Sequence, residues 1–167
     1  CLLFSPPSSS IEIGDGMDRR QFILLAPALV MVPYSVTAAT RKVWSAVEAS
    51  DALAKGEISL IDIRSRDEWM DTAVAKEAWP ISMHEPRFEQ RLFAARDQSG
   101  EKPIALICAT GGRSGRLLSA LIRAGYPDFI DVSEGMLGSP KGPGWIARGL
   151  PVTDLEVAVA NLPDVLR

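Results

Sequence analysis

Cys108 is the side chain in this sequence best suited to covalent chemistry. It ends a continuous apolar run and is followed by Gly111, Gly112 and Arg113, and then by a helical pattern that begins near Ser114. Backbone N–H groups of such a loop, together with the amino end of the following helix, favour an anion on or beside the sulfur and would supply thiolate near neutral pH. The two glycines let the backbone curl without Cβ clashes, and Arg113 could contact an oxyanion.

A simpler interpretation of Cys108 is a buried, inert cysteine at a strand end, because free cysteine is among the most buried residue types. The order of strand, cysteine, glycine-rich loop, arginine and helix favours a reactive thiol instead.

The chain around Cys108 alternates strand and helix patterns. Short β-rich or apolar runs predict four strands, at 58–63, 78–83, 103–108 and 129–132; Pro80 suits an edge strand. Helical spacing, caps and stop signals predict helices at 50–56, 66–70, 85–97, 114–124 and 145–148. Gly125 is expected in the left-handed conformation after its helix.

The last part of the chain is less regular. Residues 138–144 form a loop by composition. This loop looks like an insertion that reshapes the mouth of a pocket; the alternative is a surface insertion that the fold tolerates. Leu155, Val159 and Leu162 are expected to cover one face. The alternation predicts an α/β three-layer sandwich with a mainly parallel central sheet flanked by helices, in which sites form beyond the carboxyl ends of strands.

Composition excludes several functions. The chain has 167 residues and a formal net charge of −3, and a dedicated nucleic-acid binder would usually be basic. Two cysteines and one histidine cannot build a Cys/His zinc cage with four protein ligands, so no metal is expected and no cofactor is implied. The length suits one domain, and at most one disulfide is possible.

Residues 1–39 are predicted to be a leader and not part of the fold. Residues 1–16 have no clear periodicity and read as disordered or as sequence upstream of a start at Met17. From Met17 a basic head, a short apolar run and small residues ending at Ala39 follow the layout of a secretory signal peptide. The apolar run is short for a bilayer span of ~20 residues and contains two prolines. An uncleaved membrane anchor and a buried helix are the alternatives.

Arg19-Arg20-Gln21-Phe22-Ile23 resembles the twin-arginine export motif, although Asp18 stands where that motif usually has Ser or Thr. This resemblance implies a bacterial periplasmic protein, with no stable membrane insertion after cleavage. The mature domain would be residues 40–167. Cleavage would remove Cys1 and leave Cys108 as a lone cysteine in an oxidising compartment.

Several motifs in the body resemble the rhodanese family. Residues 108–114 match the Cys-x-x-Gly-x-Arg-Ser form of its active-site loop, and 60–64 with Glu68-Trp69 resemble its early "IDVR…EW" signature. Residues 78–81, 134–136 and 144–152 resemble its "GAxxI" and "GG…W…GLPV" segments, so the likeness runs from about residue 43 to 152. The family's "GHIPGA" is replaced by residues 71–78 and lacks its histidine; His84 lies later and is expected to be a surface or loop residue.

The resemblance implies a thiosulfate sulfurtransferase-like enzyme. The Cys108 thiolate would take sulfane sulfur from a small anionic donor as a persulfide and pass it to a thiol, cyanide or a protein sulfur acceptor. Asp62 and Arg64 would support the loop from behind, with an ordinary strand-end salt bridge as the alternative. The residues that would bind the donor and hold the persulfide are those that follow Cys108: Ala109, Thr110, Gly111, Gly112, Arg113 and Ser114.

Three other functions remain open. A phosphatase of a related fold would use Cys-x5-Arg, and this loop has Cys-x4-Arg, which makes a tighter cradle. Retention of Cys108, Gly111 and Arg113 argues against a non-catalytic binding module but does not exclude a sulfur carrier that hands on a persulfide. A thiol oxidoreductase would normally need a Cys-x-x-Cys pair, which is not present.

Overall fold

The computed structural model describes residues 42–167, and the predicted leader, start at Met17 and signal peptide lie outside the described residues. A five-stranded parallel sheet forms the centre, in the order β1-β6-β5-β2-β4. Its strands are β1 (Val43–Trp44), β2 (Ser59–Asp62), β4 (Trp79–Pro80), β5 (Ile104–Ile107) and β6 (Phe129–Val132). Every residue of β5 is buried, as expected for the central strand of a sheet covered on both faces.

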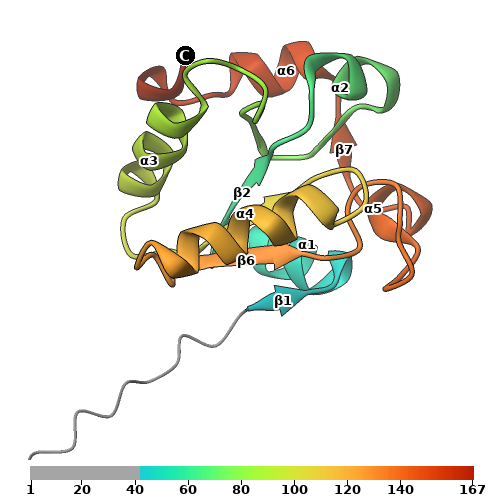
Figure 1. Cartoon of the computed structure of the whole chain (residues 1–167). Helices are drawn as coiled ribbons and strands as arrows, with labels where there is room; N and C mark the ends of the chain where they lie inside the picture. The colour runs from blue at the N-terminus through green and yellow to red at the C-terminus, as the bar shows by residue number, and fades with distance from the viewer. Residues whose placement is uncertain (1–41) are drawn as a thin grey trace, which may run out of the picture. The chain divides into compact units, whose positions relative to one another are not determined.

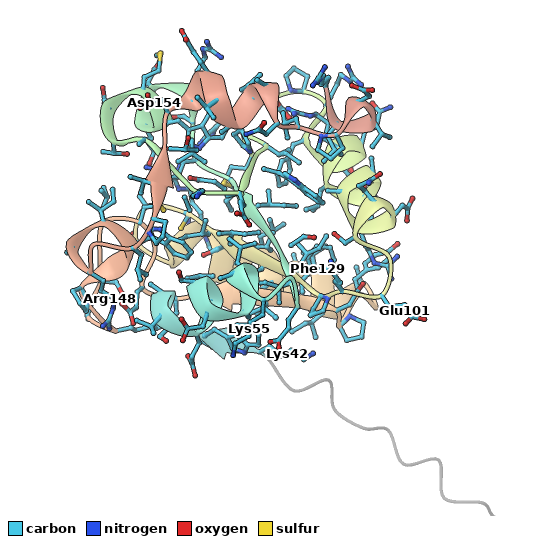
Figure 2. All side chains as sticks on the ribbon, turned by 180° about the vertical axis from the view of Figure 1, so that it is seen from behind. Lys42, Lys55, Glu101, Phe129, Arg148 and Asp154 are labelled. Carbon is cyan, nitrogen blue, oxygen red and sulfur yellow. The ribbon has the colours of Figure 1, made fainter. Side chains whose placement is uncertain are left out.

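Helices cover both faces of the sheet, which confirms the predicted three-layer α/β architecture. Figure 1 shows α4 in front of β6 with α1 behind, and Figure 2 shows the same molecule from the α1 side. The helices are α1 (Ala46–Ala54), α2 (Arg66–Thr72), α3 (Phe88–Ser99), α4 (Gly112–Arg123), α5 (Gly144–Ala147) and α6 (Leu155–Ala160), followed by the 3-10 turn η1 (Asp164–Leu166).

Two separate apolar clusters result from the alternation of side chains along the strands. On one face Leu60 and Ile107 pack with residues of α1, α5 and α6. On the other face Ile61, Leu106 and Cys108 pack with residues of α3, α4 and η1. Cys108 therefore belongs to the layer between the sheet and α4.

A two-stranded antiparallel sheet, not predicted from the sequence, joins β3 (Val74–Ala75) to β7 (Val152–Thr153). Because β3 directly follows α2, this pairing fixes the carboxyl end of α2 against the last third of the chain. β3 and β7 have two residues each, and no run of apolar or β-branched residues around them marks a strand.

Several predicted helix boundaries were wrong. The first helix begins after Ser45 instead of at Ser50, because Ser45 and Glu48 form a reciprocal capping box. The helix predicted from Glu85 begins at Phe88, and the one predicted from Ser114 begins at Gly112. Val159, expected to face the core, is 40% exposed, whereas Leu155 and Leu162 are buried.

Other local predictions are confirmed. The strand at 129–132 has the expected bounds, Pro80 lies in an edge strand, and Gly125 has a positive φ of 89° after α4. Across residues 42–167, no helix combines the length and apolar character needed to span a bilayer.

Candidate active site

Cys108 follows β5 directly, and the backbone then turns into α4 within four residues. Gly111 makes this turn possible. It caps α4 with φ of +76°, and a Cβ built there would lie 2.0 Å from the carbonyl oxygen of Ser133. Any other residue at this position would suffer backbone strain from the positive φ and a clash of its Cβ with the backbone of Ser133. Gly112, expected to serve the same purpose, is the first residue of α4 and has no such close contact.

A second loop, residues 133–137, holds the first part of the Cys108 loop from behind. Met136 donates its backbone N–H to the carbonyl of Cys108, and Leu137 donates to the carbonyl of Ala109, at 2.9 and 2.8 Å. Gly135 has a positive φ, and a Cβ there would lie 2.4 Å from the Ala109 oxygen. The loop that carries the sulfur is thus fixed by backbone bonds from the connection after β6.

The sulfur of Cys108 lies within a buried polar chain. Its Sγ is 3.5 Å from Oγ of Ser114, and that hydroxyl donates to Oδ1 of Asp131 at 2.6 Å. Cys108 is 1% exposed, and Ser114 and Asp131 are fully buried. An aspartate carboxylate only accepts hydrogen bonds, so the Ser114 proton lies towards Asp131 and a hydroxyl lone pair remains for the thiol.

Arg113 lies on the solvent side of the same loop and is held by Glu68 of α2. Its Nη1 donates to Oε2 of Glu68 at 2.8 Å, and its Nη2 donates to Oε1. This pair lowers the pKa of Glu68 from its usual 4.5 to about 2 and raises the pKa of Arg113, to which the nearby Cys108 sulfur adds a smaller contribution. The Arg113 guanidinium is therefore a fixed positive charge beside the sulfur.

His84 lies at the outer edge of this pair. Its Nε2 is 3.4 Å from Nη1 of Arg113, and the residue is exposed in the loop between β4 and α3. The loop placement agrees with the sequence interpretation, but its contact with Arg113 was not foreseen.

Asp62 and Arg64 form a fully buried ion pair at the end of β2. Arg64 contacts Asp62 through Nε and Nη2, and its remaining donors go to Thr72 and to the carbonyls of Glu68 and Ala73. These bonds tie β2 to both ends of α2. The pair is therefore linked by hydrogen bonds to α2, whose Glu68 binds Arg113.

Glu134 fixes the loop at residues 138–144. Its carboxylate accepts from the backbone N–H of Gly144 and from Arg148, and these bonds lower the pKa of Glu134. Within the loop, Ser139 and Gly142 form an isolated antiparallel bridge. Leu137, which begins this region, is 53% exposed beside Ala109.

The structure brings together the whole predicted loop and adds residues that the sequence did not reveal. Thr110 is exposed and Ala109 is half-buried at the loop surface. Glu68 was missed because its sequence signal, the capping box with Ser65, describes only local bonds. Asp131 had a usable signal, since an acid inside a buried apolar strand needs a polar partner. Among residues 42–167 there is no group of His, Cys, Asp and Glu arranged to hold a metal.

The sequence pattern of the Rhodanese-like domain matches residues 45–138, which is more than half of the chain. No relative is found among curated proteins.

Three solved structures are similar to this chain, and the likeness in fold rests on the first two, whose TM-scores reach 0.50. The protein Rv0390 from M. tuberculosis is 24% identical, with a TM-score of 0.52 over 67% of this chain and 96% of that one. A rhodanese-like domain from Anabaena sp. is 16% identical, with a TM-score of 0.50 over 74% and 86%. A polysulfide-sulfur transferase homodimer from Wolinella succinogenes is 25% identical, with a TM-score of 0.47 over 70% and 81%.

Proposed function

Since the chain belongs to the rhodanese-like domain family, a family of sulfurtransferase type, we propose that it transfers sulfane sulfur through a persulfide on Cys108. The donor is a small anion such as thiosulfate, and the acceptor is a thiol or cyanide. The observation that carries the proposal is the position of Cys108 at the end of β5, with α4 and Arg113 supplying positive charge beside its sulfur.

The first half-reaction is a displacement at sulfur. The Cys108 thiolate attacks the outer sulfur of thiosulfate, the sulfur–sulfur bond of the donor breaks, and sulfite leaves with the bonding electron pair. The product is a Cys108 persulfide anion. Arg113 and the amino end of α4 favour the negative charge at this position in the donor, the transition state and the product.

The second half-reaction returns the enzyme to its starting state. An acceptor thiolate attacks the outer sulfur of the persulfide, the bond to Cys108 breaks, and Cys108 leaves as a thiolate. No oxidant or reductant is needed, because with a thiol acceptor one sulfur–sulfur bond is exchanged for another in each step. With cyanide the second step forms the carbon–sulfur bond of thiocyanate, and Cys108 again leaves as a thiolate. Ping-pong kinetics are expected.

The test is intact mass spectrometry after incubation with thiosulfate. The full chain should gain the mass of one sulfur atom, and the gain should be absent in Cys108→Ser. Cys1→Ser is the matched control and should still gain the sulfur. A chain that gains no sulfur from several sulfane donors but hydrolyses p-nitrophenyl phosphate would contradict the proposal.

A non-catalytic or sulfur-carrier module is the second candidate, and two observations favour it. Cys108 is 1% exposed, and both terminal nitrogens of Arg113 are bound to Glu68. A carrier would accept a persulfide from a partner without turning over small donors. Steady-state turnover with thiosulfate and cyanide, abolished in Cys108→Ser, decides against this candidate.

Export to the periplasm is part of the proposed function, supported by the signal-like pattern from Met17 to Ala39. The protein recovered from a periplasmic extract should begin near Ala39 or Thr40. A membrane-bound protein with an intact leader would indicate the anchor, and a full-length cytoplasmic chain would refute export.

A further inference from the structure

A groove with a volume of about 1090 Å³ lies next to the candidate active site. Residues of α2, of the loop after β4, of the start of α3 and of the segment after α6 line it. These elements stand around the upper part of the molecule in Figure 1. The apolar part of the wall comes from Trp69, Pro80, Val159 and Leu162.

The rim of this groove is positively charged. Arg66, Arg87, Arg91 and Arg167 line it. Among the described residues Glu85 is the one acidic lining residue, and it is bonded to Arg91, while Arg167 pairs with Asp164. Arg66 and Arg87 are exposed, and neither forms an ion pair within residues 42–167. Two guanidinium groups are thus available to an anion at the edge of an apolar surface.

His84 connects the groove to the reacting sulfur. It lines the groove, and its Nε2 is 3.4 Å from Nη1 of Arg113. Arg113 in turn is the second residue of α4, at the end of the short turn that starts from Cys108. A ligand seated in the groove would therefore have one end near the mouth of the Cys108 loop.

The size and character of the groove suit an acceptor better than a donor. An inorganic anion of the size of thiosulfate needs little more than Arg113 and would leave most of the volume and the apolar wall unused. Ligand sites of this size usually hold an organic molecule, with apolar walls and a few polar groups that fix its orientation.

We propose that this groove binds the acceptor of the sulfurtransferase reaction, a peptide-sized thiol whose carboxylates contact Arg66 and Arg87 and whose thiol points towards Cys108. The inference rests on the proposed function and names its acceptor class. Trp69 gives further support, because its buried indole N–H has no hydrogen-bond acceptor among the described residues and a bound oxygen-rich ligand is one source of an acceptor.

The kinetic test compares two thiols and two double variants. In Arg66→Gln/Arg87→Gln the KM for glutathione should rise roughly five-fold, while the KM for uncharged 2-mercaptoethanol stays unchanged. Lys102→Gln/Arg123→Gln is the matched control, since it removes two exposed positive charges near the start of β5 and the end of α4, and it should change neither value. Equal changes for both thiols, or none for glutathione, would overturn the groove proposal.

The binding test does not depend on turnover. S-methylglutathione keeps the carboxylates of glutathione but cannot accept sulfur. It should shift the indole N–H resonance of Trp69, identified with Trp69→Phe, in the wild-type chain but much less in Arg66→Gln/Arg87→Gln. A response to a longer acidic peptide, with none to S-methylglutathione, would point to a protein partner and overturn the proposal.

The two tests separate two kinds of failure. A chain that transfers no sulfur to any acceptor overturns the proposed function. An unshifted Trp69 resonance in a chain that does transfer sulfur overturns the groove proposal alone.

Discussion

The two strands beside β5 each carry one buried aspartate, and these two aspartates have different hydrogen-bond partners. Asp62 of β2 lies opposite Ile107, and Asp131 of β6 lies opposite Leu106. Both are fully buried. Because side chains alternate along a strand, the two point to opposite faces of the sheet: Asp131 faces α4 and the sulfur, and Asp62 faces the α1 side.

Their partners explain the difference. Asp62 binds the side chain and backbone of Arg64, whose other donors reach α2, so this pair acts as a structural anchor. Asp131 accepts from Ser114, whose hydroxyl is 3.5 Å from the Cys108 sulfur. The two carboxylates thus differ in what their partners contact: Arg64 connects Asp62 to α2, and Ser114 connects Asp131 to the Cys108 sulfur. Two predictions test this difference, and a third concerns the partly exposed ion pair of Glu68 with Arg113.

The largest expected effect is on stability. Arg64→Met leaves the Asp62 carboxylate buried without its cation, which should lower the free energy of unfolding by about 3–5 kcal/mol. Urea unfolding followed by tryptophan fluorescence measures it. The same substitution at Arg96, which pairs with Asp128 at a site where both side chains are more than a third exposed, should cost much less. Equal losses in the two variants would show that Asp62–Arg64 is no anchor.

A smaller effect is expected on reactivity. Asp131→Asn removes a carboxylate close to the Cys108 sulfur. Because a nearby negative charge disfavours a second one, its removal should favour the thiolate over the thiol. Alkylation of the folded protein by iodoacetamide at pH 7 should become several-fold faster, measured by intact mass. Asp51→Asn removes an exposed carboxylate of α1, on the other face of the sheet, and is the control that should leave the rate within about twofold. Similar acceleration in both variants would refute the distinction.

The smallest expected effect concerns acid stability. The pKa of Glu68 is lowered to about 2 by Arg113, so its ionised form is favoured in the folded state. That stabilisation is fully present above pH 4.5, its usual pKa, and is lost as the pH falls towards 2. Glu68→Gln should remove this part of the pH dependence, below about 1 kcal/mol for a partly exposed pair. The free energies of unfolding of the wild type and of Glu68→Gln are measured from pH 5 to pH 2. A constant difference between them over this range would contradict the prediction.

Much of the fold follows from local sequence patterns. The apolar run before Cys108 identified β5, and residues 129–132 identified β6 with its full bounds, because buried strands need apolar side chains on both faces. The predicted start of α1 differs from the observed one by several residues, because two serines, at positions 45 and 50, both suit a helix cap and the capping box forms at Ser45. The pairing of β3 with β7 joins segments almost eighty residues apart, and no local pattern encodes it.

The candidate site divides in the same way. The sequence by itself determined the proposed nucleophile Cys108, its glycine-containing turn and the arginine after it, because a tight loop between a buried strand and a helix restricts residue types locally. Only the tertiary structure decided that Glu68 holds Arg113, that Asp131 holds Ser114, and that Asp62 and Arg64 act through α2. Each of these contacts joins separate elements at the carboxyl edge of the sheet. Their existence depends on strand order and face, which are set by the packing of the whole domain and not by any one segment.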